Sequence, residues 1–415
     1  MSATFLKRLL ALILSFLIPA LSFTFTRSDA ARKDAGVAAA LDKTGGLVKG
    51  VCHAHEDYDL LRDGNIEWER SDIPYPFNDD GTLSASYLWW KDEAQRYLEN
   101  GIRVFAVTPY PDEFIEHGLD PRDPDDRTAI QDVARFFVED LKDVVGIFQV
   151  SNELSVDRFR APLTLDEAAA FIGMQLEVMK PLCDKYGILI GYNLTASVEQ
   201  PFIMLQYNHL VDYVGLDCYI GCFEDILHET DTFTLFAGAV RQLTGKPILF
   251  CEFGYIGEGE PKGAEGKAAV LREYGYESEE AATADMANFL QKLPPRIRDE
   301  ILRLYPDATN EEYADMLFNG EYKNHLYRDL PEGYSINGCP HTPEGQAKFF
   351  SEVIPKIFKL DYVIGAVVYC WSDSDACYVC GQTDCPVETR WGLVTRDGAP
   401  KPAYYAVQKA FADAA

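Results

Sequence analysis

Short apolar runs rich in β-branched and aromatic residues recur along the chain from about residue 47 onward. Runs of this length with little polar alternation are typical of strands buried on both faces, as in a parallel sheet. Eight of them are present, at residues 47–53, 66–73, 102–110, 144–150, 188–193, 213–219, 247–253 and 362–371. The pattern therefore predicts eight parallel strands.

Amphipathic segments with helix-start signals lie between most of these runs. Thr164 and Glu167 form a capping box for a helix that ends near Gly187. Thr342 followed by Pro343 begins the helix that precedes the last run. Alternating strands and helices in this number predict a closed (β/α)8 TIM barrel, an α/β fold of about 250 residues.

The largest excess over that size follows the seventh run. Residues 256–341 contain charges, turns and at least two helix patterns, one of which starts at the capping box of Thr309 and Glu312. We expect a largely helical insertion at the end of the barrel where the active sites of this fold lie. The insertion could act as a lid over the active site, form a wall of the substrate site, or have a purely structural role, and the sequence leaves these alternatives open. The catalytic barrel is predicted to span residues 47–415, after an N-terminal segment at 23–46.

The first 22 residues are predicted to be a signal peptide. Lys7 and Arg8 precede an apolar run at 9–23, and Ala20 and Ser22 offer small residues for cleavage. An uncleaved anchor is the alternative, although a membrane span normally needs about 20 apolar residues. We expect a secreted or extracytoplasmic protein without membrane contact after signal cleavage.

The charge of the chain bears on its partners. Its 38 basic and 66 acidic residues give a formal net charge of −28. Such a surface repels phosphate backbones, so no nucleic-acid partner is expected. A hydrophobic content of 47% excludes a disordered chain.

Cysteines form a second pattern. Cys377, Cys380 and Cys385 lie in one polar loop, and Cys339 precedes them near the end of the insertion. In an exported protein, four such thiols predict two disulfides, with a four-thiolate structural zinc site as the alternative. Either would join the insertion to the loop after the eighth strand. No catalytic metal is expected.

Residues suited to chemistry follow the predicted strands. In a TIM barrel, side chains just past the carboxyl ends of the strands line the active site. Those ends supply, in chain order, His53, Arg70, Tyr110, Asn152, Glu153, Tyr219, Glu252 and Trp371. Glu153 and Glu252, after the fourth and seventh strands, would face each other across the barrel. Glycoside hydrolysis needs such a carboxylate pair.

The sequence resembles retaining glycoside hydrolases of clan A, the "four-seven" superfamily, with local likeness to families 5 and 39. The resembling segments are residues 68–73, 101–105, 151–153, 250–254 and 391–405. The resemblance implies that Glu153 is the acid/base and Glu252 the nucleophile in the cleavage of a β-linked glycan or glycoside by double displacement, without a cofactor.

The same resemblance implies a sugar-binding role for further residues. Asn152 would hold the sugar 2-hydroxyl, Tyr219 would contact the nucleophile, and Arg70 would sit beside it. Trp371 would form the floor of the sugar subsite, with His53 and Tyr110 also at the substrate.

Three further residues, Asp217, Cys218 and Cys251, lie near the ends of the predicted sixth and seventh strands. Asp217 and Cys218 lie where many clan members have a histidine, which leaves the exact family and the substrate open. Strand alternation predicts that Cys251, next to Glu252, points away from the barrel axis.

Two other functions compete with a glycosidase. A non-catalytic carbohydrate-binding barrel would share the fold. A metal-dependent amidohydrolase would use His53 and His55, with Asp373 as a further ligand. That class also needs histidines after the fifth and sixth strands, where this sequence has none.

Overall fold

The computed structural model describes residues 35–414 except 196 and 198. The predicted signal peptide and residues 23–34 lie outside the described residues. Within the described part, no helix is both long enough and apolar enough to span a membrane.

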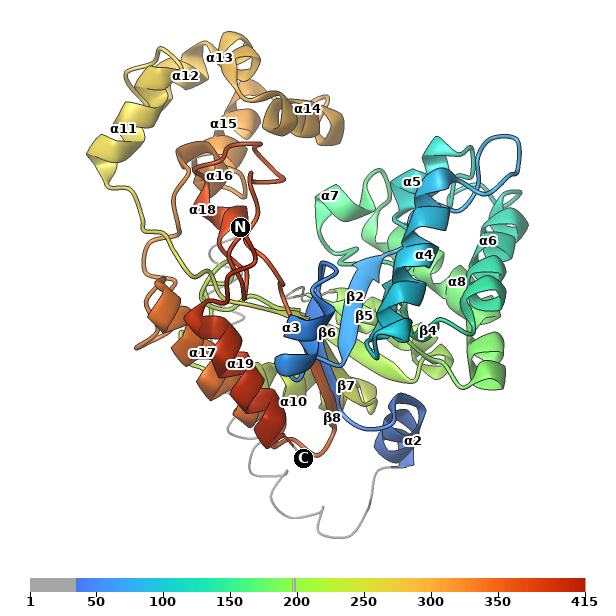
Figure 1. The fold of residues 1–415 in the computed structure, drawn as a ribbon. Helices are drawn as coiled ribbons and strands as arrows, with labels where there is room; N and C mark the ends of the chain where they lie inside the picture. Colours follow the sequence, from blue (N-terminus) through green and yellow to red (C-terminus); the bar gives the residue numbers. More distant parts are fainter. Residues whose placement is uncertain (1–34, 196, 198, 415) are drawn as a thin grey trace.

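Eight parallel strands close into a barrel in which each strand pairs with its neighbours in sequence and β1 pairs with β8 (Figure 1). The predicted TIM barrel is confirmed. The strands are β1 (Val48–Cys52), β2 (Trp68–Asp72), β3 (Arg103–Val107), β4 (Val145–Gln149), β5 (Leu189–Leu194), β6 (Tyr213–Cys218), β7 (Ile248–Phe253) and β8 (Val363–Val368).

Helices surround the barrel, as the alternating pattern predicts. The Thr164 capping box begins α8, and Gly187 ends it with a left-handed φ of 72°. The helices outside the insertion are α2 (Ala35–Thr44), α3 (Tyr58–Asp63), α4 (Ala85–Glu99), α5 (Pro111–Glu116), α6 (Arg127–Leu141), α7 (Asp157–Arg160), α8 (Leu165–Tyr186), α9 (Gln200–Met204), the 3-10 helix η1 (Leu205–Leu210), α10 (Thr232–Thr244), α17 (Pro343–Ile357), α18 (Pro386–Thr389) and α19 (Pro402–Asp413).

The barrel interior is a packed apolar core rather than a channel. Inward-facing residues such as Trp68, Phe105 and Tyr213 fill it. Helix α2 closes the amino-terminal end, where Val37 and Ala40 join the same cluster. Only the opposite end, which we call the barrel mouth, presents the carboxyl ends of the strands.

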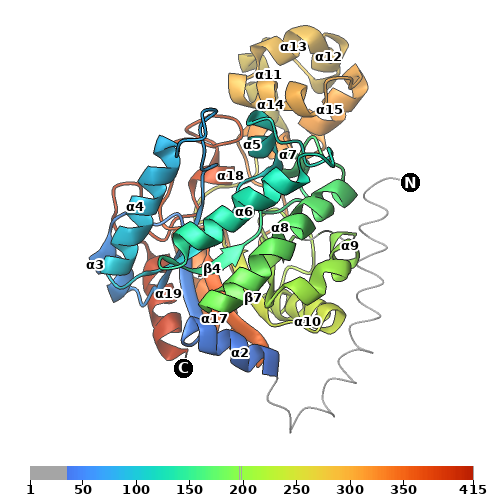
Figure 2. The same ribbon diagram turned by 90° about the vertical axis from the view of Figure 1, so that its right-hand side faces the viewer.

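Six helices lie between β7 and α17, at the mouth end of the molecule and opposite α2 (Figure 2). They are α11 (Ala264–Glu273), α12 (Glu279–Ala284), α13 (Met286–Lys292), α14 (Pro295–Leu304), α15 (Asn310–Phe318) and α16 (Lys323–Tyr327). Arg158 in α7 pairs with Glu300 in α14 at 3.2 Å, and Tyr305 donates to Asp157 at 3.0 Å. The insertion is therefore fastened to the loop that follows Glu153.

Candidate active site

A buried ion pair lies at the centre of the barrel mouth. Arg70 Nη1, from β2, is 2.5 Å from Glu252 Oε1, from β7. The Tyr219 hydroxyl donates to the other oxygen, Glu252 Oε2. Both oxygens of this carboxylate thus have hydrogen-bond donors, which fix its orientation.

A bulge in β7 sets the direction of Glu252. Leu216 pairs with Phe250 and Asp217 with Glu252, so Cys251 is an extra residue in β7. The prediction that Cys251 points outward is wrong, because it packs in the barrel interior with Cys52 and Leu249. An extra residue interrupts the regular alternation of a strand and re-aims the side chains beside it.

One guanidinium and two amide donors hold Asn152 beside the ion pair. Its Oδ1 accepts from Arg70 Nη2 at 2.9 Å, Gln149 Nε2 at 2.9 Å and Asn193 Nδ2 at 2.6 Å. Its own Nδ2 donates to the Tyr110 hydroxyl at 3.3 Å. The amide oxygen is thus saturated, and the NH₂ group is left on the side of Tyr110.

Sequence reasoning missed Gln149 and Asn193 as site residues. Both are buried polar side chains inside otherwise apolar strand runs. A buried amide needs hydrogen-bond partners, so such positions could have been recognised as parts of a polar network.

Glu153 stands on a left-handed backbone, with a φ of 46°, and Ser151 has a φ of 58°. Non-glycine residues adopt this region at a cost and often do so at functional sites. The segment is held by Ser151 N, which donates to Thr108 Oγ1 at 2.9 Å, and by Glu153 N, which donates to Asn193 Oδ1 at 3.1 Å. Neighbouring strands therefore fix the position of Glu153.

The two glutamates have different electrostatic surroundings. Burial, followed by the negative charge of Glu252, raises the pKa of Glu153 to about 8, although Arg70 acts in the opposite direction. Glu153 is therefore protonated at neutral pH, while Glu252 has a guanidinium partner. A protonated carboxyl beside a carboxyl group paired with a guanidinium suits a general acid beside a nucleophile.

Asp217 adds a third carboxyl to this cluster. Burial and the charges of Glu252 and Glu153 raise its pKa well above the usual range. Its Oδ2 accepts from Asn193 at 2.5 Å, and its Oδ1 is buried without a partner among the described residues. A neutral Asp217 can donate a hydrogen bond to a neighbour without adding charge next to Glu252.

Trp371 does not lie where the sequence placed it. It is fully buried, and its indole Nε1 donates to Asp57 Oδ2 at 3.3 Å, so its faces are not open to a sugar. Tyr369 instead lies half-buried at the end of β8, edge-on to Tyr219 at 5.7 Å and to His53 at 6.0 Å. Packing against Tyr404 holds the tryptophan inside the protein.

The two histidines after β1 are exposed. His55 Nε2 is 3.0 Å from Ser372 Oγ, and Asp373 accepts from Lys401 at 2.9 Å. In the described residues, the group of histidine, cysteine and acidic side chains close enough to hold a metal ion does not include His53, His55 or Asp373.

The cysteine prediction needs correction. All ten cysteines have free thiols in this structure, so the expected disulfides are absent from the described residues. Cys377, Cys380 and Cys385 do gather, but the fourth member of their group is His325. Cys339 is buried apart from them, beside Tyr255, whose hydroxyl donates to its carbonyl oxygen at 2.5 Å.

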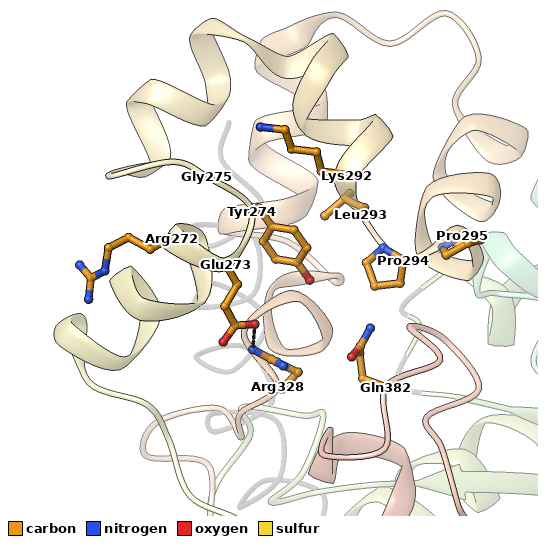
Figure 3. A pocket seen from close by; sticks show the side chains of 10 residues that line it. All are labelled: Arg272, Glu273, Tyr274, Gly275, Lys292, Leu293, Pro294, Pro295, Arg328 and Gln382. Atoms are coloured by element: carbon orange, nitrogen blue, oxygen red, sulfur yellow. Dashed lines mark hydrogen bonds and ion pairs between the residues drawn. The ribbon is translucent and has the colours of Figure 1, made fainter.

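A hollow of about 650 Å³ lies in the insertion, where Arg328 donates to Glu273 at 2.6 Å and Gln382 of the cysteine loop adds to the wall (Figure 3). None of its lining residues is a predicted site residue. This hollow is therefore separate from the predicted active site.

No protein-family model matches the sequence, and no curated protein matches it either. The fold is similar to those of solved glycoside hydrolases. A family 2 β-galacturonidase from Eisenbergiella tayi, bound to galacturonate, has a TM-score of 0.50 at 14% identity, over 88% of this chain and 51% of that one. A β-glucuronidase from Faecalibacterium prausnitzii has a TM-score of 0.50 at 14% identity, over 89% and 49%.

A family 39 glycoside hydrolase from Bacteroides cellulosilyticus WH2 has a TM-score of 0.51 at 11% identity, over 89% of this chain and 64% of that one. The chain spans about half to two thirds of the length of these three structures. At such low identity the likeness shows the shared barrel fold.

Proposed function

We propose that this protein is a secreted, retaining glycoside hydrolase that cleaves a β-linked glycan or glycoside. The observation that supports this most is the contrast between the two glutamates. Glu252 is held by Arg70 and Tyr219, whereas burial and Glu252 keep Glu153 protonated at neutral pH. The similar folds of solved glycoside hydrolases agree with the proposal.

The reaction would proceed in two displacements. Glu252 attacks the anomeric carbon while Glu153 gives its proton to the leaving oxygen, so the glycosidic bond breaks as the glycosyl–Glu252 ester forms. Glu153, now ionised, then removes a proton from water, which attacks the ester and releases the sugar and Glu252. This mechanism requires a separation of about 5–5.5 Å between the two carboxyl groups.

Sugar binding would use the polar and aromatic groups around this pair. The Asn152 NH₂ group and the Tyr110 hydroxyl, 3.3 Å apart, can hold the 2-hydroxyl. Tyr369 and the exposed His53 would take the wall of the subsite in place of Trp371, since aromatic rings pack well against sugar C–H groups.

The first test is a screen of the purified protein against chromogenic β-glycosides and plant and microbial polysaccharides. Uronides belong in the screen because two of the solved structures are named for them. We expect neutral sugars to be better substrates, since Arg70 and Lys401 at the mouth already pair with Glu252 and Asp373. Binding of sugars without any turnover would instead favour a non-catalytic barrel.

Tyr219→Phe removes the hydroxyl that donates to Glu252. Because hydrogen bonds to charged groups contribute about 1.5–3 kcal/mol, we expect kcat to fall by roughly 10- to 100-fold. Tyr192→Phe is the matched control, since the buried Tyr192 hydroxyl has no partner among the described residues. Equal kcat values for the two variants would remove Tyr219 from the mechanism.

The pH profile should report the protonation of Glu153. An acid catalyst must hold its proton, so kcat/KM for a glycoside with a poor leaving group should fall as pH rises through about 8, the raised pKa of Glu153. Rates measured from pH 4 to 10 test this. A Glu153→Gln variant that keeps the same alkaline decline would assign it to another group.

A further inference from the structure

Three thiols and one imidazole meet outside the set of predicted active-site residues. Cys377, Cys380 and Cys385 come from the loop after β8, and His325 comes from α16 of the insertion. Their candidate ligand atoms all lie within 4.8 Å of one another, and all four residues are buried. The chain thus brings together segments more than fifty residues apart to form one cluster of metal-binding side chains.

The distances within the cluster suit a tetrahedral ion. His325 Nδ1 is 3.4 Å from Cys377 Sγ and 4.0 Å from Cys385 Sγ. With zinc–sulfur bonds of about 2.3 Å and zinc–nitrogen bonds of about 2.0–2.1 Å, a tetrahedral site separates sulfur from nitrogen by about 3.6 Å. The two measured distances lie on either side of that value.

The backbone of the loop supports the same arrangement. Cys377 and Cys380 have the two-residue spacing of a zinc-binding turn. Cys380 N lies 3.4 Å from Cys377 Sγ and donates to it, and Gly381 N donates to the Cys377 carbonyl at 2.8 Å. Gly381 has a φ of 74°, a conformation that other residues adopt with strain. The turn directs both thiols toward one point.

We propose that His325, Cys377, Cys380 and Cys385 bind one structural zinc ion. Three thiolates and an imidazole fill all four coordination positions, which is typical of structural rather than catalytic zinc. A disulfide between any two of the cysteines would leave the third thiol and the imidazole buried beside it. The proposal does not depend on the glycosidase function.

The ion would fasten the insertion to the β8 loop close to the barrel mouth. Tyr378, between two of the ligands, accepts a hydrogen bond from Arg158 of α7 at 3.3 Å. Arg328, three residues after His325, pairs with Asp384 next to Cys385 at 3.2 Å. In Figure 1 the α18 segment of this loop lies between α16 and the barrel. The cluster therefore links the insertion, the β8 loop and the loop after Glu153.

The experiment is elemental analysis of the purified full-length protein after dialysis against metal-free buffer. We expect about one equivalent of zinc per chain, as in other closed four-ligand sites. His325→Ala and Cys380→Ser should each lose most of it. Cys339→Ser, a buried cysteine outside the cluster, is the matched control and should keep the full equivalent.

Measurements on the wild-type protein test the proposal even if these variants do not fold. Chelation should lower the Tm of the wild-type protein, because removing a ligand that binds the native state removes its stabilisation. Zinc should restore the Tm, whereas magnesium, which does not bind at a thiolate site, should not. Cobalt in place of zinc should give the charge-transfer absorption of thiolate ligands. Non-reducing peptide mapping that finds a disulfide within 377–385, or zinc-saturated protein after Cys380→Ser, would overturn the proposal, as would wild-type protein that binds no zinc.

Discussion

Glu252→Ala is expected to reduce turnover by on the order of 10⁶-fold, the size of loss found when an enzyme loses its nucleophile. Without this carboxylate no glycosyl-enzyme can form, so the loss should extend to every substrate, including aryl glycosides with good leaving groups. The measurement is kcat on the best substrate from the screen. The variant also leaves Arg70 buried without its partner, so folding must be checked by thermal unfolding.

Glu252→Gln is the companion variant, because it keeps the volume and a hydrogen-bond acceptor for Arg70. If both variants are folded and inactive, the loss is chemical rather than structural. The anomeric form of the first-formed product, followed by NMR, provides an independent check. An inverted product, or near wild-type turnover by either variant, would contradict the double displacement.

Glu153→Ala is expected to show a loss that depends on the leaving group. General acid catalysis contributes about 10²- to 10⁴-fold, so turnover of unactivated glycosides should fall by that amount. Aryl glycosides with acidic phenols need little protonation, so the glycosyl-enzyme should still form and then persist, because no base activates water. Azide, which needs no base, should restore part of the rate and yield a glycosyl azide.

The configuration of that azide distinguishes the two carboxyl roles. A β-glycosyl azide from a β-glycoside indicates attack on a glycosyl–Glu252 ester, as proposed. Glu252→Ala, which cannot form the ester, should not yield a β-glycosyl azide when azide is added. If Glu153→Ala loses the same fraction of turnover on unactivated and on aryl glycosides, and if azide does not restore its rate, Glu153 is not the acid/base.

Much of the barrel was predictable from local pattern. The run predicted at 213–219 is strand Tyr213–Cys218, and the Thr164 and Thr342 caps begin α8 and α17. Strands buried on both faces are continuous apolar runs, and helix caps use a few neighbouring residues, so both signals lie within short stretches of sequence. The carboxyl ends of parallel strands then place Arg70 and Glu252 at one end of the barrel without further information.

The site was harder to predict where the direction or burial of a side chain depends on residues far away in the sequence. Alternation along β7 gave the wrong direction for Cys251, because a bulge is defined by pairing with β6 and β8. Trp371 and Tyr369 both follow β8, and only packing on Tyr404 and hydrogen bonding to Asp57 decide which is buried.

Local pattern is enough to predict the (β/α)8 fold and the positions of Glu153 and Glu252 at strand ends, because the spacing of apolar residues and the order of the strands can be read along the chain. Long-range contacts, by contrast, determine that His325 rather than Cys339 joins the cysteine loop, and that Tyr369 rather than Trp371 lies beside Tyr219. They also place Glu153 near the carboxyls of Glu252, Glu224 and Glu388. Side-chain partners, burial and pKa depend on distances between residues far apart in the chain, and those distances exist only after folding.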